Sequence, residues 1–102
     1  MTFETIRVEE AGGVATLTLD RPEKLNALNV LMGEEICSAL EVLARSASAR
    51  VLVVTGAGRI FSSGGDLSSM DQIAGSASSI DHSVRIYCNV ARRLRELPLP
   101  VV

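Results

Sequence analysis

The sequence predicts an α/β fold in which a sheet is covered by amphipathic helices. Two segments with alternating side chains come first, Phe3–Glu9 and Val14–Leu19, and a long segment with helical periodicity follows them. A short apolar run, Val51–Thr55, then leads through a polar stretch to a second helical pattern. Strands that alternate with helices in this order are typical of α/β layering.

The first two strands are expected to form an antiparallel hairpin. In Phe3–Glu9, Ile6 and Val8 fall on the same face, which suits an edge strand or a half-covered strand. The connection at residues 10–13 contains two adjacent glycines, and Val14–Leu19 alternates more regularly than the first strand. A glycine-containing connection between two alternating runs favours a hairpin.

A polar break at residues 20–24 separates this hairpin from the first expected helix. Apolar side chains then recur at steps of three and four, which places them on one helical face. They are Leu28, Leu31, Met32, Ile36, Ala39, Leu40 and Leu43. Asn29 stands where it can cap the start of this helix.

The second half begins with Val51–Thr55, which is almost wholly apolar and therefore predicts a strand covered on both faces. Residues Asp71 to Ser79 are rich in Ser, Ala and Gly and predict a mobile loop. Apolar positions from Ile80 to Leu94 mark a second amphipathic helix, which the following prolines end. Val101 and Val102 resemble the start of another strand, so we expect the chain to be the N-terminal part of a longer protein.

Composition narrows the possible partners. The 102 residues are 47% apolar, enough for one domain with a modest core, and the net charge is -2 with no block of Lys or Arg. The longest apolar runs are far shorter than the roughly 20 residues of a membrane-spanning helix, and the N-terminus lacks a signal pattern. We therefore expect a cytoplasmic protein that binds a small molecule, with no nucleic-acid and no membrane partner.

Metal and redox chemistry find little support in the sequence. Cys37 and Cys88 lie far apart in helical patterns, without a CxxC spacing, and His82 is the single histidine. Both cysteines are expected to be buried free thiols, and no metal site is expected.

The glycine-rich stretch Ile60–Met70, IFSSGGDLSSM, is the main candidate for a functional loop. A dinucleotide fingerprint would need glycine where Phe61 stands, a Walker loop would need a lysine after a glycine, and no Gly-x-Ser-x-Gly elbow occurs. What remains is close approach of a ligand to the backbone, because Gly64 and Gly65 can present peptide N–H groups without hindrance. Taken alone, the stretch favours a structural turn capped by Asp66.

Three stretches together resemble the crotonase superfamily, whose best-known member is enoyl-CoA hydratase. They are Asp20–Leu28 (DRPEKLNAL), Val51–Leu67 (VLVVTGAGRIFSSGGDL) and Leu97–Val102 (LPLPVV). The resemblance implies repeated ββα units, with residues 1–102 as the N-terminal part of a single domain and the remainder absent from this chain. It also implies an acyl-CoA thioester as substrate and a homotrimer, often paired into a hexamer.

The resemblance assigns the oxyanion donor to the residue after the motif glycine. By this similarity the N–H of Gly65 is one of two donors to the thioester oxygen, where charge develops as an enolate. The backbone at Ala27, Leu28, Ser62 and Gly64 is implied to flank the CoA moiety.

Four further residues complete the implied site. Lys24 is a candidate for the CoA phosphates, although Lys24 and Arg21 also suit a solvated turn. Asp66 is expected to act as cap and loop anchor beside the substrate rather than as a general base, because a base must reach the substrate proton. Leu67 belongs to the same motif, and Met70 with the following loop is expected to line the acyl pocket.

The implied function is that of an enoyl-CoA hydratase, a lyase of fatty acid metabolism that adds water syn to 2-enoyl-CoA. Isomerase, dehalogenase and decarboxylase reactions on acyl-CoA stay open, as does a non-catalytic CoA-binding or structural role if the chain ends at residue 102. The family's catalytic glutamates lie beyond the strand that begins at Pro100, so this chain alone is expected to be inactive. No cofactor is expected, because CoA is part of the substrate.

Overall fold

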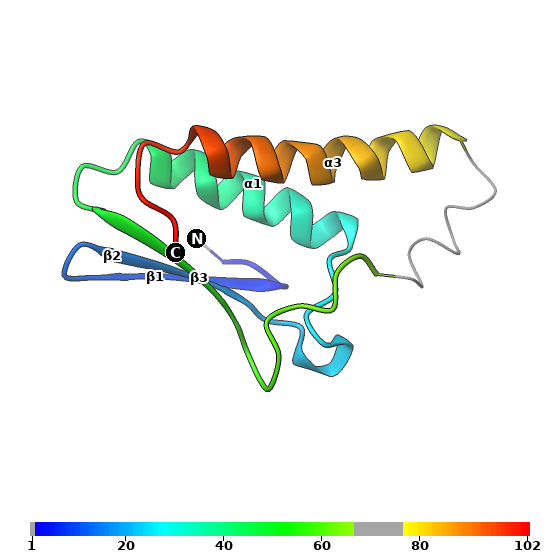
Figure 1. Cartoon of the computed structure of the whole chain (residues 1–102), viewed down its shortest axis with the longest axis horizontal. Helices are drawn as coiled ribbons and strands as arrows, with labels where there is room; N and C mark the ends of the chain where they lie inside the picture. Colours follow the sequence, from blue (N-terminus) through cyan, green and yellow to red (C-terminus); the bar gives the residue numbers. More distant parts are fainter. Residues whose placement is uncertain (1, 67–76) are drawn as a thin grey trace.

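The computed structural model describes residues 2–66 and 77–102. In this part of the chain, a three-stranded sheet is covered on one face by two α-helices (Figure 1). The elements are β1 (Ile6–Ala11), β2 (Val14–Leu19), the 3-10 helix η1 (Pro22–Lys24), α1 (Val30–Ala44), β3 (Val51–Gly56) and α3 (Ala77–Glu96). The predicted α/β layering is therefore present, and α1 and α3 lie side by side.

The sheet has the order β1-β2-β3. β1 and β2 pair antiparallel, as the hairpin prediction requires, and β2 and β3 pair parallel with Val14 opposite Val51. The parallel pair needs a crossover, which α1 supplies. Val101 forms a parallel bridge with Leu52, and Val102 N–H donates to the Leu52 carbonyl at 2.8 Å. The last two residues thus pair with β3 as the start of a further strand would, as expected from the sequence.

The core lies between the sheet and the helical layer. Leu17 of β2, Leu52 of β3, and Met32 and Leu40 of α1 are each at most 1% exposed. The expectation that β3 is covered on both faces is not met here, because within the described residues only Leu52 of this strand is buried. The helices cover one face of the sheet, and the β3 valines on the other face are only partly buried.

The two helices approach closely at Gly33. A Cβ atom placed on Gly33 would overlap Cγ2 of Ile86 in α3, so the glycine allows the two helix axes to come together. Asn29 caps α1 as predicted, because its side chain accepts a hydrogen bond of 2.9 Å from Met32 N–H.

Two sequence expectations need correction in this half of the chain. The predicted loop Asp71–Ser79 ends earlier, because α3 already begins at Ala77; residues 71–76 lie outside the described part. Cys88 is exposed rather than buried, whereas Cys37 is half-buried, and neither forms a disulfide. Burial raises the pKa of the Cys37 thiol, and the nearby Arg93 partly opposes this rise.

Candidate functional site

A sharp turn between β2 and α1 brings residues 26–28 beside the glycine-rich loop. Pro22 opens η1, where its fixed φ fits and its missing N–H removes no bond. Leu25 and Asn26 then both adopt φ 54, in the left-handed region. Asparagine tolerates this conformation, but for leucine it is uncommon, so other contacts must hold the turn in place.

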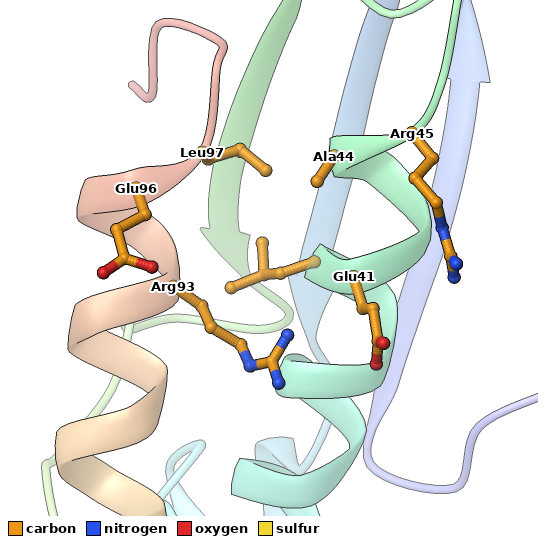
Figure 2. A pocket seen from close by; sticks show the side chains of 7 residues that line it. Glu41, Ala44, Arg45, Arg93, Glu96 and Leu97 are labelled. Atoms are coloured by element: carbon orange, nitrogen blue, oxygen red, sulfur yellow. The ribbon is translucent and has the colours of Figure 1, made fainter.

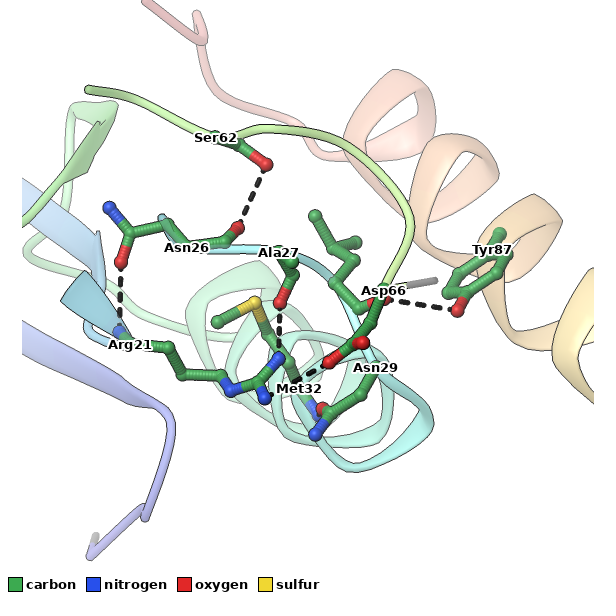
Figure 3. A network of polar contacts seen from close by, with 9 residues as sticks. Arg21, Asn26, Ala27, Asn29, Met32, Ser62, Asp66 and Tyr87 are labelled. Atoms are coloured by element: carbon green, nitrogen blue, oxygen red, sulfur yellow. Dashed lines mark hydrogen bonds and ion pairs between the residues drawn. The ribbon is translucent and has the colours of Figure 1, made fainter. Parts of the chain in front are cut away.

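Asn26 supplies most of these contacts. Its side chain is fully buried; Oδ1 accepts from Arg21 N–H at 2.8 Å, and Nδ2 donates to the carbonyls of Ala57 at 2.8 Å and Ile60 at 3.0 Å. Its own carbonyl accepts from the Ser62 hydroxyl at 2.8 Å (Figure 3). Asn26 therefore ties the turn before α1 to the loop after β3.

Next to this network, Leu28 and Gly65 form a short parallel bridge. Leu28 N–H donates to the Gly64 carbonyl at 2.7 Å, and Asp66 N–H donates to the Leu28 carbonyl at 2.9 Å. The peptide between Gly64 and Gly65 is planar and trans, so its N–H points opposite to the carbonyl that Leu28 holds. The Gly65 N–H consequently points away from Leu28, and among the described residues it has no acceptor.

The two glycines differ in conformation. Gly64 has φ 101, a region that L-residues with side chains rarely adopt, whereas Gly65 is not in the positive-φ region. Glycine is thus required at position 64 for the turn, and residue 65 contributes its exposed backbone.

A largely buried ion pair between Arg21 and Asp66 lies next to the bridge. Arg21 Nη2 lies 3.1 Å from Asp66 Oδ2, with side-chain exposures of 13% and 8%, and Arg21 Nη1 donates to the Ala27 carbonyl at 2.5 Å. Arg21 is therefore not the solvated turn residue that one reading of the sequence expected. Figure 3 shows its guanidinium between the Ala27 carbonyl and Asp66.

Helix α3 is joined to the bridge by Tyr87. Its hydroxyl donates to the Leu28 carbonyl at 3.1 Å, so this carbonyl accepts from both Tyr87 and Asp66. Burial raises the pKa of the Tyr87 hydroxyl, and the negative charge of Asp66 raises it further. The hydroxyl therefore stays protonated at neutral pH, as a donor to Leu28 must.

Most of the residues predicted for the site lie together in the structure. The turn contributes Ala27 and Leu28, and the loop contributes Ser62, Gly64, Gly65 and Asp66. Lys24 is exposed at the end of η1, and its side chain has no hydrogen-bond or ion-pair partner among residues 2–66 and 77–102. Leu67 and Met70 lie outside the described residues.

Three residues at this site were not predicted from the sequence: Arg21, Asn26 and Tyr87. Asn26 carried a usable signal, since asparagine is a common non-glycine residue in left-handed turns and it lies inside the Asn-Ala-Leu element. The opposite charges of Arg21 and Asp66 in two separate motifs were a weaker signal. For Tyr87, the sequence carried no signal of a role at this site other than its place on the apolar face of a helical pattern.

Among the hollows of the described structure, two lie beside the bridge or between the helices. An apolar cavity of about 170 Å³ adjoins the bridge, lined by Leu28, Phe61 and Ser62 and by core side chains of the sheet and both helices. A shallow groove lies between the far ends of α1 and α3, where Glu41, Arg45, Arg93 and Glu96 mix both charges (Figure 2). Of the residues predicted for the site, Leu28 and Ser62 line the cavity and none lines the groove.

The described residues contain neither a cluster of metal-binding side chains nor a membrane-spanning helix. There, no three His, Cys, Asp or Glu side chains are grouped so that they could hold a metal ion. Within the same residues, neither helix has the length and apolar character needed to cross a bilayer.

Comparison with known proteins gives one consistent family. Residues 9–102 match the profile of the enoyl-CoA hydratase/isomerase family. The chain is 38% identical to a trans-2-decenoyl-[acyl-carrier-protein] isomerase of Streptococcus mutans, with all of this chain and 40% of the relative covered. It is 41% identical to the 1,2-epoxyphenylacetyl-CoA isomerase of Escherichia coli, again over the whole chain and 39% of the relative. The chain thus spans about two fifths of the length of these relatives.

Solved structures agree with the sequence relatives. An enoyl-CoA hydratase/carnithine racemase from Magnetospirillum magneticum superposes with a TM-score of 0.91 at 29% identity, over 98% of this chain and 38% of that one. A putative enoyl-CoA hydratase from Streptomyces coelicolor gives a TM-score of 0.87 at 37% identity, over 98% and 37%. The described elements therefore have the same arrangement as the corresponding part of these proteins.

Proposed function

Because the chain belongs to the crotonase (enoyl-CoA hydratase/isomerase) family and has the fold of its N-terminal part, we propose that the intact protein acts on acyl-CoA thioesters. The first reaction to test is the addition of water to a 2-enoyl-CoA. The single observation that carries this proposal is the Gly65 peptide: residue 65 is exposed, and its N–H is directed away from its own hydrogen-bonded bridge.

The chemistry requires such a donor. Adding water across the double bond of a conjugated thioester moves negative charge onto the thioester oxygen, as it does when that double bond migrates. A peptide N–H that already points at this oxygen stabilises the charge without reorganising during the reaction. In the proposed site Gly65 is one donor, and no second donor or catalytic acid is assigned to residues 1–102.

The CoA moiety is proposed to lie along the turn and the loop that the bridge joins. Ala27 and Leu28 on one side, and Ser62 and Gly64 on the other, would border the pantetheine and adenine. Lys24 is free among the described residues to reach a phosphate, as an exposed cation near this edge. Met70 is proposed to line the acyl pocket and Leu67 to contribute to substrate binding, although both lie outside the described residues. Trimers or hexamers are the proposed assembly.

The proposal is tested by two substitutions at one position. Gly65→Pro removes the N–H but neither bond of the bridge, because those bonds use Gly64 and Asp66. Gly65→Ala keeps the N–H and is the matched control. In the intact protein we expect the proline variant to lose roughly 10²- to 10³-fold in kcat, the usual effect of removing one oxyanion donor, and the alanine variant to stay close to wild type. An equal kcat for the proline variant and wild type would rule out Gly65 as the donor.

Double-bond isomerisation is the second candidate, because two of the relatives are named as isomerases. Product mass separates the two reactions: hydration adds one water to the acyl-CoA, whereas isomerisation leaves the mass unchanged. If the intact protein neither binds nor converts any acyl-CoA, the proposed function is wrong.

A further inference from the structure

The guanidinium of Arg21 contacts both segments of the bridge. Ala27 precedes Leu28 in one segment, and Asp66 follows Gly65 in the other. Arg21 donates to the carbonyl of the first and to the carboxylate of the second. Because the bridge is parallel, Ala27 lies before the paired residues and Asp66 after them, so Arg21 ties the start of one segment to the end of the other.

The part of the loop that precedes the two glycines has contacts of its own. Asn26 binds the carbonyl of Ile60, and the Ser62 hydroxyl both donates to the Asn26 carbonyl and accepts from Gly64 N–H at 3.0 Å. These bonds fix the loop before Gly65. Among the described residues, the bridge has two backbone hydrogen bonds, and the Gly64–Gly65 peptide is held directly by the one from Leu28 N–H to the Gly64 carbonyl. The contacts that hold Ala27 and Asp66, the neighbours of Leu28 and Gly65, therefore help to keep this peptide in its orientation.

Arginine suits this position for two physical reasons. Its donors are fixed in one plane, so a carbonyl and a carboxylate that both bind it are held at a defined separation. The pair is also largely removed from water. In such an environment, charge-assisted hydrogen bonds are stronger than on the surface. A lysine could keep the charge but would not reproduce this geometry.

We propose that Arg21 is a positioning residue for the reaction: through Ala27 and Asp66 it fixes the direction of the Gly65 N–H, without touching the substrate itself. The inference rests on the proposed function, because it assigns a purpose to the direction of that N–H. Small displacements of a catalytic group lower the rate strongly, so the loss of Arg21 should act on kcat.

Kinetics of the intact protein give the first test. Arg21→Lys keeps the charge and most of the stem, so it is the variant chosen to stay folded, and Arg21→Met removes the charge as well. The matched controls are the same changes at Arg7, whose ion pair with Asp20 is exposed and lies on β1. We expect kcat to fall about 10-fold or more in both Arg21 variants with KM within about threefold, as for an interaction made in the transition state. The Arg7 variants should match wild type.

A spectroscopic test separates positioning from a structural role. A saturated acyl-CoA with a ¹³C-labelled thioester carbonyl cannot be hydrated, and its carbonyl stretch falls when a donor binds the oxygen. We expect the bound stretch in folded Arg21→Lys to return toward that of the free ligand, and the Arg7 variants to keep the wild-type frequency. Wild-type kcat together with a wild-type carbonyl stretch in folded Arg21→Lys would overturn the inference.

The two proposals fail differently in this experiment. If wild-type protein shows neither turnover nor a shifted carbonyl stretch, the proposed function fails and the role of Arg21 fails with it. If wild type shows both and the Arg21 variants do the same, only the role of Arg21 is lost.

Discussion

At the scale of single residues, Asn26 joins two parts of the chain that are distant in sequence. It is fully buried, yet all three of its side-chain hydrogen bonds are satisfied, by one peptide N–H and two carbonyls. A buried polar side chain whose bonds are complete selects one arrangement of the backbone around it. Here that arrangement sets the turn of η1 against the end of β3.

We expect substitution of Asn26 to destabilise the fold. Asn26→Ala removes the partner of one N–H and two carbonyls and puts at φ 54 a residue that tolerates this conformation less well than asparagine, so the free energy of unfolding should fall by about 3 kcal/mol. Asn26→Gly loses the same bonds but tolerates the backbone, so its loss should be about 1 kcal/mol smaller. Urea denaturation measures both.

Asn29→Ala is the control for these variants. It removes one capping bond at the start of α1, and a loss of about 1 kcal/mol is expected. If the Asn26 variants lose no more than this control, Asn26 does not organise the turn.

At the scale of the elements, the helical layer depends on one glycine. Gly33 allows α1 to approach α3, because a Cβ at this position would overlap Cγ2 of Ile86. That methyl belongs to a β-branched side chain in a helix, which has little freedom to rotate away. The contact sets the distance between the two helices.

Gly33→Ala should therefore destabilise the protein although alanine favours helices by about 1 kcal/mol over glycine. Overpacking of this kind costs about 1–3 kcal/mol, so we expect a net loss in thermal denaturation. In the Ile86→Ala background the methyl is gone, and the same change at Gly33 should become neutral or stabilising. An additive double variant would show that the two residues do not contact each other.

Tyr87 makes a second connection between elements, and its effect depends on pH. Its pKa is raised in the folded chain, so above about pH 10 the unfolded chain loses the proton first. The stability that the neutral hydroxyl contributes is thus complete below pH 10 and falls as the pH rises through the folded pKa.

Tyr87→Phe is expected to lower the free energy of unfolding by about 1 kcal/mol at neutral pH, the typical value of one hydrogen bond. The difference between wild type and variant should shrink above about pH 10. Guanidinium denaturation at a series of pH values measures it; a difference that grows with pH would contradict the raised pKa.

At the scale of the whole molecule, periodicity in the sequence predicted most of the architecture. The alternation in Val14–Leu19 and the helical spacing from Leu28 to Leu43 are local signals, and both elements lie where expected. The positions Ala27, Leu28, Ser62, Gly64 and Asp66 also lie together. Their roles toward a ligand stay predictions.

What the sequence could not reveal depends on distant pairing. Arg21 and Asp66 are 45 residues apart, and nothing in either segment marks the other as its partner. The covering of β3 was overestimated for a related reason, since an apolar strand does not say which of its faces this chain itself covers. Side-chain identity predicts local conformation, whereas long-range contacts require the folded chain.

The residues that contact each other at the bridge are far apart in sequence, and this separation affects the order in which the contacts form during folding. The β1–β2 hairpin closes a short loop, whereas the Arg21–Asp66 and Tyr87–Leu28 contacts close loops of 45 and 59 residues. Loop-closure entropy delays such contacts until the sheet and α1 have brought their partners together. The Gly65 peptide would then be among the last groups ordered as the chain folds, and the proposed ligand, if it binds there, would chiefly stabilise this late-forming region.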